Sequence, residues 1–371
     1  MRVVIVGAGT FGASLAWWLA REGDDVTLVD QFEPGDRRAT SGGETRLIRV
    51  GHGDEDYYTA MAWRARTLWR ELEAESGADL FVECGIAWFA HGDDGWEAES
   101  ERTIRAQGIP CEHLDPAAAA ELFPGLGAGD LAWVLFEPHT GVLRAQRAVQ
   151  ALAGQAAEHG ARILRARARP DGGAAILDDG TRLEGDAVVW ACGPWLARLF
   201  PEHVPLRVTL QELLFFAAGP AWHAIPGWCD YDRAIYGTPD LDELGAKAAA
   251  DYEGPELDPD AELPEQATTE QIVRGYFDER FPALAAAPLV ESRTCRYETT
   301  ADTNFVAWPH PEHPHVWLVG GGSGHGFKHG PALAERLAAA LHGDAELPAM
   351  FAVGERRQGR SLRTAGHGIR L

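Results

Sequence analysis

Residues 3–12, Val-Val-Ile-Val-Gly-Ala-Gly-Thr-Phe-Gly, decide the fold. The apolar run at residues 3–6 predicts a short buried strand, and the glycines at positions 7, 9 and 12 predict a tight turn that opens a helix. A second apolar run, residues 26–29, ends at Asp30, 18 residues after Gly12. A strand, a glycine turn, a helix, a strand and a terminal acid in this order are typical of a βαβ unit that binds a dinucleotide.

The spacing of this fingerprint gives each residue a physical task. Gly7 permits the tight turn, Gly9 lets the backbone approach a pyrophosphate, and Gly12 allows the helix to pack against the strand. The helix N-terminus supplies oriented N–H groups for the phosphates, and we expect Asp30 to accept a hydrogen bond from a ribose hydroxyl. The fingerprint suits FAD and NAD equally, so the rest of the chain must distinguish them.

The hydrophobic pattern beyond the fingerprint predicts two domains built from alternating segments of the chain. Alternating strand and helix patterns predict an α/β fold with a discontinuous, Rossmann-like nucleotide-binding domain in residues 1–79, 140–205 and 300–371. Its longest predicted helix spans residues 57–75. Short strands and turns predict a second, α+β substrate domain, built on a mixed or antiparallel sheet, in residues 80–139 and 206–299.

Composition narrows the class of protein. The 371 residues carry 56 acidic and 33 Lys or Arg side chains, a formal charge of −23 that repels nucleic acids and anionic membranes. The five cysteines show neither a CxxC pair nor a zinc-ligand spacing, so we expect no metal site and a reducing cytoplasm. The first strand pattern starts at residue 2, and no apolar run reaches the ~20 residues of a membrane helix. The sequence therefore predicts a soluble cytoplasmic protein.

Three further motifs distinguish the cofactor. They are Gly-Gly-Glu-Thr-Arg-Leu-Ile-Arg at residues 42–49, Thr-Cys-Arg-Tyr at 294–297 and Gly-Ser-Gly-His-Gly-Phe-Lys at 322–328. In order and spacing they resemble the monomeric sarcosine oxidase and N-methyltryptophan oxidase family over nearly the whole chain. The resemblance implies an FAD-binding domain and an FAD-dependent oxidase of small amines or amino acids, acting as a monomer with dioxygen as the acceptor.

The resemblance also assigns residues to the cofactor. Cys295 occupies the position where the family joins a sulfur to the flavin ring, although a lone cysteine on a strand is otherwise a small buried hydrophobe. Arg46 is expected against the flavin face, and the 322–328 turn against the flavin edge, where its N–H groups stabilise charge on the reduced ring. The full set of implied FAD contacts is Gly7, Gly9, Thr10, Phe11, Gly12, Asp30, Gln31, Ser41, Thr45, Arg46, Gly193, Trp195, Cys295, Gly322, Gly324, His325, Gly326, Phe327 and Lys328.

A second set of residues is implied for substrate and oxygen. Arg49 and Lys328 match the pair that holds the substrate carboxylate. Lys247 matches the lysine that helps reduced flavin react with dioxygen; it lies among small apolar residues, where a charge needs a partner. Tyr236 and Tyr297 match aromatic residues of the substrate cavity. Without the resemblance, Arg49 and Lys328 would be interpreted as solvated surface residues and Lys247 as a charge on an edge strand. The two tyrosines would be interpreted as core residues.

Two positions depart from the family pattern. Gly42 and Asp251 stand where sarcosine-type members carry histidines. We expect a glycine at 42 to enlarge the cavity, and an inward-facing carboxylate at 251 to favour a cationic group on the substrate. Sarcosine itself therefore does not follow from the resemblance, and a bulkier secondary amine, a cyclic imino acid or a glycated amino acid suits the pattern.

The implied reaction removes two electrons and a hydrogen from the neutral amine. The resulting imine hydrolyses to an aldehyde or keto acid plus amine, while dioxygen is reduced to hydrogen peroxide. An FAD-dependent amine dehydrogenase, or a flavin subunit that passes electrons to a partner, is the first alternative and leaves Lys247 idle. An NAD-dependent dehydrogenase is the second and leaves the motifs at 294–297 and 322–328 unexplained.

Overall fold

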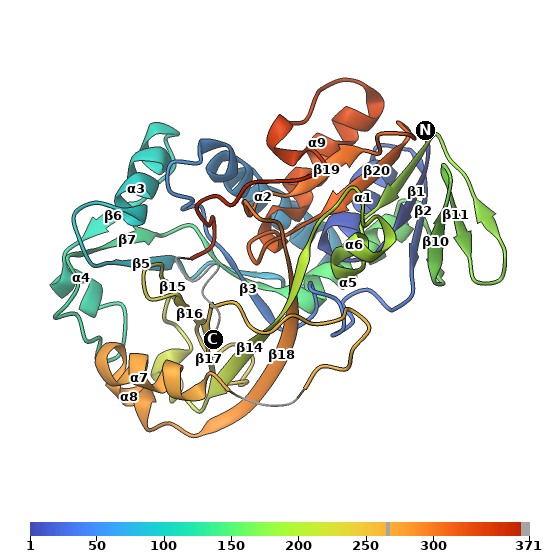
Figure 1. Ribbon diagram of the computed structural model, residues 1–371. Helices are drawn as coiled ribbons and strands as arrows, with labels where there is room; N and C mark the ends of the chain where they lie inside the picture. Colours follow the sequence, from blue (N-terminus) through green and yellow to red (C-terminus); the bar gives the residue numbers. More distant parts are fainter. Residues whose placement is uncertain (265–267, 365–371) are drawn as a thin grey trace.

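The first of two large sheets carries the fingerprint. The computed structural model describes residues 1–264 and 268–364 (Figure 1). Six strands run in the order β19-β20-β13-β1-β2-β9, all parallel to their neighbours except β19. Their bounds are β1 (Arg2–Val6), β2 (Asp25–Asp30), β9 (Arg162–Arg165), β13 (Ala187–Trp190), β19 (Val306–Pro309) and β20 (Val316–Gly320). Residues 3–6 are buried because helices and loops cover both faces of the parallel sheet.

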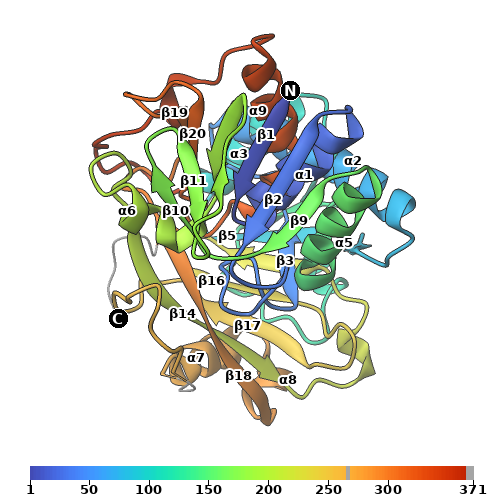
Figure 2. The ribbon, with the colours of Figure 1, turned by 90° about the vertical axis from the view of Figure 1, so that its right-hand side faces the viewer.

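Four long helices pack together beside this sheet. They are α1 (Thr10–Arg21), α2 (Asp56–Ser76), α5 (Ala145–Glu158) and α9 (Gly330–His342), and α1 lies between α5 and α9 (Figures 1 and 2). Leu15 and Leu19, four residues apart on one face of α1, are both buried, as a 3.6-residue period requires. A separate three-stranded sheet consists of β10 (Ala168–Asp171), β11 (Ala174–Leu177) and β12 (Arg182–Leu183).

The second large sheet has eight strands and mixed direction. Its order is β18-β14-β17-β16-β15-β5-β7-β6, with β15 and β5 parallel and the other neighbours antiparallel. The strands are β5 (Ile86–Ala90), β6 (Glu112–Leu114), β7 (Trp133–Glu137), β14 (Arg207–Phe216), β15 (Gly227–Asp230), β16 (Ile235–Thr238), β17 (Ala246–Ala250) and β18 (Leu289–Thr299). An aromatic core that includes Phe89, Trp228 and Phe277 packs α7 (Glu270–Arg280) against it.

Shorter elements join the two sheets. A small sheet of β3 (Thr45–Ile48), β8 (Gly141–Arg144) and β4 (Phe81–Val82) carries part of the 42–49 motif, and Figure 2 labels its strand β3. The remaining helices are α3 (Trp96–Ala106), α4 (Pro116–Ala120), α6 (Leu196–Leu199) and α8 (Pro282–Ala285), with short 3-10 turns at Gly193–Trp195, Pro220–Trp222, Phe327–His329 and Ala349–Phe351.

The fold class predicted from the sequence is confirmed. A parallel α/β sheet and a mixed sheet are both present, and the helix predicted over residues 57–75 is α2. Every strand of each large sheet falls within the segments predicted for that sheet's domain, while the exact domain boundaries stay a prediction. No helix within residues 1–264 and 268–364 combines the length and apolar character needed to cross a bilayer.

Candidate cofactor and substrate site

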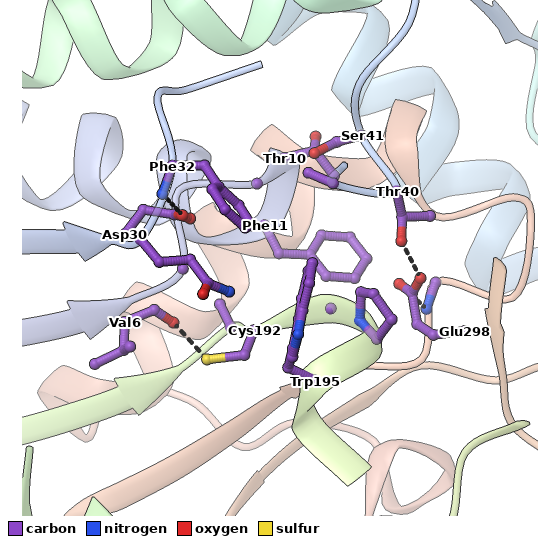
Figure 3. Close-up of a pocket in the computed structure, with 18 of the residues that line it drawn as sticks. Val6, Thr10, Phe11, Asp30, Phe32, Thr40, Ser41, Cys192, Trp195 and Glu298 are labelled. Carbon is purple, nitrogen blue, oxygen red and sulfur yellow. Dashed lines mark hydrogen bonds between the residues drawn. The ribbon is translucent and has the colours of Figure 1, made fainter. Parts of the chain in front are cut away.

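A large cavity extends from the fingerprint turn to the 322–327 turn and encloses about 350 Å³ (Figure 3). It lies beyond the carboxyl ends of β1 and β13, where parallel sheets place their ligand sites. Most of the residues predicted to hold FAD line this cavity: Gly7, Gly9, Thr10, Phe11, Asp30, Gln31, Ser41, Arg46, Gly193, Trp195, Gly322, Gly324, Gly326 and Phe327.

Backbone atoms pack so closely against the fingerprint glycines Gly7 and Gly12 that neither position has space for a side chain. A Cβ atom at Gly7 would lie 2.2 Å from the Ala191 carbonyl oxygen, and Gly7 has a φ of 109° that favours glycine. A Cβ atom at Gly12 would lie 1.9 Å from the Gly7 carbonyl oxygen. Gly9 is the N-cap of α1, and no side chain of the described residues caps that end. The open N–H groups of α1 therefore fit the phosphates of a dinucleotide.

Asp30 holds the fingerprint turn as well as facing the cavity. Its carboxylate oxygens accept hydrogen bonds from the Ala8 N–H at 2.6 Å and from the Phe32 N–H at 2.8 Å, the second of which is drawn in Figure 3. Burial raises the pKa of this carboxyl, against the lowering effect of the two N–H donors. Asp30 can still receive a ribose hydroxyl, because a carboxylate has more than two lone-pair sites.

Glu298 is a buried lining residue that the sequence analysis missed. Its carboxylate accepts a hydrogen bond from the Thr40 hydroxyl at 2.7 Å, drawn in Figure 3, and another from the Gly322 N–H at 3.3 Å. Burial raises the pKa of Glu298. The residue follows the 294–297 motif directly, but its partners are distant in sequence. It ties the loop before β3 to the 322 turn across the cavity.

Arg46 lies where the large cavity meets a second, smaller one. Its guanidinium donates to the carbonyl oxygens of Thr40, Gly42 and Thr45 at 2.7 to 2.9 Å. The guanidinium carbon is 5.7 Å from the centre of the Phe327 ring, and Arg46 lines both cavities. The three backbone carbonyl oxygens thus hold the positive charge of Arg46 where the two cavities meet.

Gly42 does not enlarge the cavity, contrary to expectation. A Cβ atom there would lie 2.5 Å from the Asp36 carbonyl oxygen and 2.8 Å from the Arg37 Cα atom. Position 42 therefore points into its own loop, and backbone crowding explains the glycine.

The second cavity encloses about 60 Å³ and brings together all seven residues predicted for substrate and catalysis. These residues come from five separate segments of the chain: Arg46, Arg49, Tyr236, Lys247, Asp251, Tyr297 and Lys328. The chain contains only two lysines, Lys247 and Lys328, and both lie in this cavity. Lysine is rarely buried without a function, so this placement marks the cavity as a site.

Arg49 and Lys328 are buried without an acidic ion-pair partner among residues 1–264 and 268–364. Arg49 donates to the carbonyl oxygens of Gly51 at 2.8 Å and Leu362 at 3.0 Å, and Lys328 donates to that of His325 at 3.0 Å. Burial lowers the pKa of Lys328 well below its usual range, and Arg49 lowers it further. This pair of cations is prepared to receive an anion.

Glu137 holds the backbone that follows Arg49. Its carboxylate accepts from the N–H groups of Val50 and Gly51, each at 2.8 Å, and from the Trp88 indole at 2.9 Å. The guanidinium of Arg49 lies over Trp88, 5.0 Å from the ring centre. Glu137 therefore positions Arg49 without neutralising it in an ion pair.

Lys247 projects from β17 toward β3. Its amine lies 2.7 Å from the Thr45 hydroxyl and 3.1 Å from the Thr45 carbonyl oxygen, and 5.6 Å from the centre of the Tyr236 ring. Burial, reinforced by Arg46, lowers the pKa of Lys247 to about 7. Thr45 was expected to contact FAD; its hydroxyl instead binds Lys247, and Thr45 is absent from the described lining of both cavities.

Asp251 faces the second cavity but is already paired. Arg363, which the sequence analysis missed, places Nη1 2.6 Å from the Asp251 carboxylate, and the Tyr297 hydroxyl donates to it at 3.3 Å. The expectation that Asp251 favours a cationic substrate group is therefore wrong, because Arg363 supplies that charge. No motif surrounds Arg363, so only the path of the chain could reveal it.

Cys295 lies on β18 in a small core with Ala249 and Tyr297. Burial raises the pKa of its thiol, while Arg46 and Lys247 act in the opposite direction. Cys295 and Gly12 are absent from the described lining of both cavities. The covalent bond to FAD stays a prediction.

Three buried histidines pack beside Lys328. Ring nitrogens of His52, His325 and His329 lie within 4.8 Å of one another. Burial and the charge of Lys328 lower the pKa of each ring well below its usual range, so the three imidazoles are neutral. Because Lys328 and Arg49 already place positive charge here, a metal ion is disfavoured. His325 lines the second cavity, and its carbonyl oxygen holds Lys328.

Residues 2–340 match the sequence profile of the family described as DAO: FAD dependent oxidoreductase. The chain belongs to this DAO family. Its cofactor is FAD, and the alternative of an NAD-dependent dehydrogenase is wrong. The glycine cradle and the open end of α1 fit this cofactor.

Relatives of this DAO-family chain include monomeric sarcosine oxidase from Bacillus sp. (strain B-0618), which is 28% identical over 355 residues, 90% of each chain. N-methyl-L-tryptophan oxidase from Salmonella enteritidis PT4 (strain P125109) is 27% identical over 350 residues, 90% of this chain and 92% of the relative. The resemblance expected from the motifs is confirmed.

Solved structures of the same fold include L-proline dehydrogenase from P. horikoshii, with a TM-score of 0.79 and 23% identity over 94% of this chain and 95% of that one. Iminodiacetate oxidase from Chelativorans sp. BNC1 gives a TM-score of 0.78 and 21% identity over 95% of this chain and 99% of that one. These similarities confirm the architecture of the DAO-family chain.

We predict that Gly12→Ala weakens FAD binding by about tenfold or more, because overpacking against a backbone carbonyl costs roughly 1–3 kcal/mol. The ratio of absorbance at 450 nm to that at 280 nm after purification measures the flavin content. Gly154→Ala in α5, where no atom lies within 4 Å of the new Cβ, is the matched control and should retain full flavin. Full flavin in Gly12→Ala would contradict this account.

Proposed function

We propose that this protein is an FAD-dependent oxidase of a secondary amine or of an N-substituted or cyclic amino acid. The observation that carries the proposal is the pair of buried cations, Arg49 and Lys328, in a cavity that adjoins the cofactor cavity. Arg46, Tyr297, Gly324 and Phe327 line both cavities, so a substrate held by the two cations lies next to the cofactor.

The residues of the large cavity are suited to hold FAD. The N-terminus of α1, with Gly7 and Gly9, would bind the pyrophosphate, and Asp30 the ribose. When bound, FAD supplies the acceptor for the two electrons and the hydrogen that leave the substrate. Arg46 and the 322–327 turn would lie beside its ring.

Arg49 and Lys328 bind and orient the substrate carboxylate. A planar guanidinium suits bidentate capture of a carboxylate, and the ammonium adds a point charge. The bound carboxylate would raise the depressed pKa of Lys328 and keep the amine charged. Tyr236 and Tyr297 pack beside the substrate and help exclude water.

No side chain of the second cavity needs to act as a strong base. Asp251 is its only lining carboxylate among the described residues, and Arg363 holds that group as an ion pair. A neutral amine can deliver its hydrogen and electrons directly to the acceptor. The cavity therefore acts by orientation and charge.

The relatives support the substrate class, since sarcosine and N-methyl-L-tryptophan oxidases are named for N-methyl amino acids. We further propose that dioxygen is the acceptor, that hydrogen peroxide is a product, and that the protein is a cytoplasmic monomer whose two domains have the boundaries given above. Lys247 supports an oxidase, because a buried ammonium beside the cofactor favours electron transfer to dioxygen; in an amine dehydrogenase or a flavin subunit that charge would have no use.

The test of the function is anaerobic bleaching of the flavin near 450 nm by N-methyl, N-alkyl, cyclic and glycated amino acids. We expect at least one to reduce the enzyme, and Lys328→Met to weaken its binding by roughly 30-fold or more, the equivalent of losing a charge-assisted contact of about 2–3 kcal/mol. Bleaching by none of them, or equal bleaching by the carboxamide of the best substrate, would contradict the proposal.

Lys247 should control the reaction with dioxygen. We predict that Lys247→Met slows oxygen uptake by about a hundredfold while anaerobic bleaching by substrate changes little, because only the oxygen step uses the charge. In the wild type the oxygen step should slow as pH rises through about 7, because Lys247 loses its proton there. Stopped-flow reoxidation of the reduced enzyme measures the rate of the oxygen step. A rate that does not change with pH around 7 would exclude this role for Lys247.

The cofactor link to Cys295 can be tested by acid precipitation. We predict that the wild-type pellet stays yellow and that Cys295→Ser releases its flavin, because the sulfur is the proposed point of attachment. Cys229→Ser is the matched control, since Cys229 is equally buried and lines the second cavity. Colour retained in the Cys295→Ser pellet, or lost from the control, would place the link elsewhere.

A further inference from the structure

Residues 361–364, the last that the structure describes, lie beside the second cavity, which Arg363 and Thr364 line. The Tyr231 hydroxyl donates to the Ser361 carbonyl oxygen at 2.9 Å, and Arg49 donates to that of Leu362 at 3.0 Å. The N–H of Leu362 donates to the Thr303 hydroxyl at 3.0 Å. These contacts fix the segment from both sides and direct the next side chain, Arg363, into the cavity.

The site is shaped to receive Arg363. Its side chain is 3% exposed and lies over Tyr297, with the guanidinium carbon 4.9 Å from the ring centre. A Cβ atom at Gly324 would lie 2.4 Å from the Cδ atom of Arg363, so only glycine leaves enough space. The Thr364 hydroxyl donates to the Asp251 carbonyl oxygen at 3.3 Å. Arg363 is therefore buried and held in a fixed position in the cavity wall.

The Asp251–Arg363 pair is neutral as a whole but strongly polar. Arg363 Nε is buried without a hydrogen-bond partner within the described part of the chain. A hydrocarbon placed against the pair would leave this N–H unsatisfied, and a carboxylate would be repelled by Asp251. A hydroxyl group fits both partners, because it can donate to the carboxylate and accept from the guanidinium.

We propose that Asp251 and Arg363 determine substrate specificity, selecting amino acids whose N-substituent carries a hydroxyl group. This inference rests on the oxidase function proposed above. The carboxylate binds Arg49 and Lys328 on one side of the cavity, and the hydroxylated substituent binds the Asp251–Arg363 pair. A buried polar pair that is left unpaired by the wrong substrate gives strong discrimination.

The test compares N-(2-hydroxyethyl)glycine with N-propylglycine, which has a methyl group in place of the hydroxyl, and with N-(carboxymethyl)glycine. The measurement is the anaerobic bleaching of the holoenzyme's flavin by each compound. The value compared is the rate constant of flavin reduction divided by the dissociation constant of that compound. We expect the hydroxyethyl compound to exceed each of the others by about tenfold or more, the effect of one hydrogen bond to a charged group. Equal values for the first two, or preference for the third, would overturn the proposal.

The variants separate specificity from a structural role. Asp251→Leu combined with Arg363→Met replaces the ion pair by apolar groups, a change that folded proteins tolerate. We expect this double variant to lose or invert the preference, and Asp251→Asn, which keeps the shape, to reduce it. A structural role alone would slow both substrates equally and leave their ratio unchanged, which would contradict the proposal. If no N-substituted amino acid bleaches the wild type, the oxidase function itself fails.

Discussion

Buried positive charge is the constraint on which the substrate cavity depends. Removing an ammonium or guanidinium from water costs on the order of several kcal/mol unless other groups replace the lost hydration. Backbone carbonyl oxygens provide part of that replacement for Arg49 and Lys328, and the Thr45 hydroxyl and carbonyl do so for Lys247. Because these partners carry no full negative charge, the cavity keeps a net attraction for anions inside a chain whose formal charge is −23.

The two large sheets make this arrangement possible. The fingerprint turn after β1 and the 322–327 turn after β20 line the large cavity together with β18 of the mixed sheet, and β17 contributes Lys247 to the second cavity. The small sheet with β3 lies between them and carries Thr45 and Arg46. The second cavity is lined by residues of the mixed sheet and of β3, and by the 324–328 segment that follows β20 of the parallel sheet. The two cavities adjoin each other and share lining residues such as Arg46 and Tyr297.

The sequence predicted what depends on local pattern and motif. The fingerprint and the helix at 57–75 follow from motif and periodicity, whereas the seven residues of the second cavity followed from the resemblance to the family. Arg363 and Glu298 were missed because their partners are more than 100 and 200 residues away, respectively, and depend on the path of the chain. Gly42 was misinterpreted because its side-chain direction is set by backbone crowding, which no alignment of motifs reports.

Nuclear magnetic resonance of the two lysines tests the central claim most directly. With only Lys247 and Lys328 in the chain, labelling at Cε and Nζ gives two side-chain signals whose pH titration reports each pKa. The account predicts a pKa of about 7 for Lys247, and for Lys328 a depressed pKa that rises when methoxyacetate binds but not with methoxyacetamide. Two lysines that titrate at the ordinary value near 10.5, unaffected by the carboxylate, would contradict it.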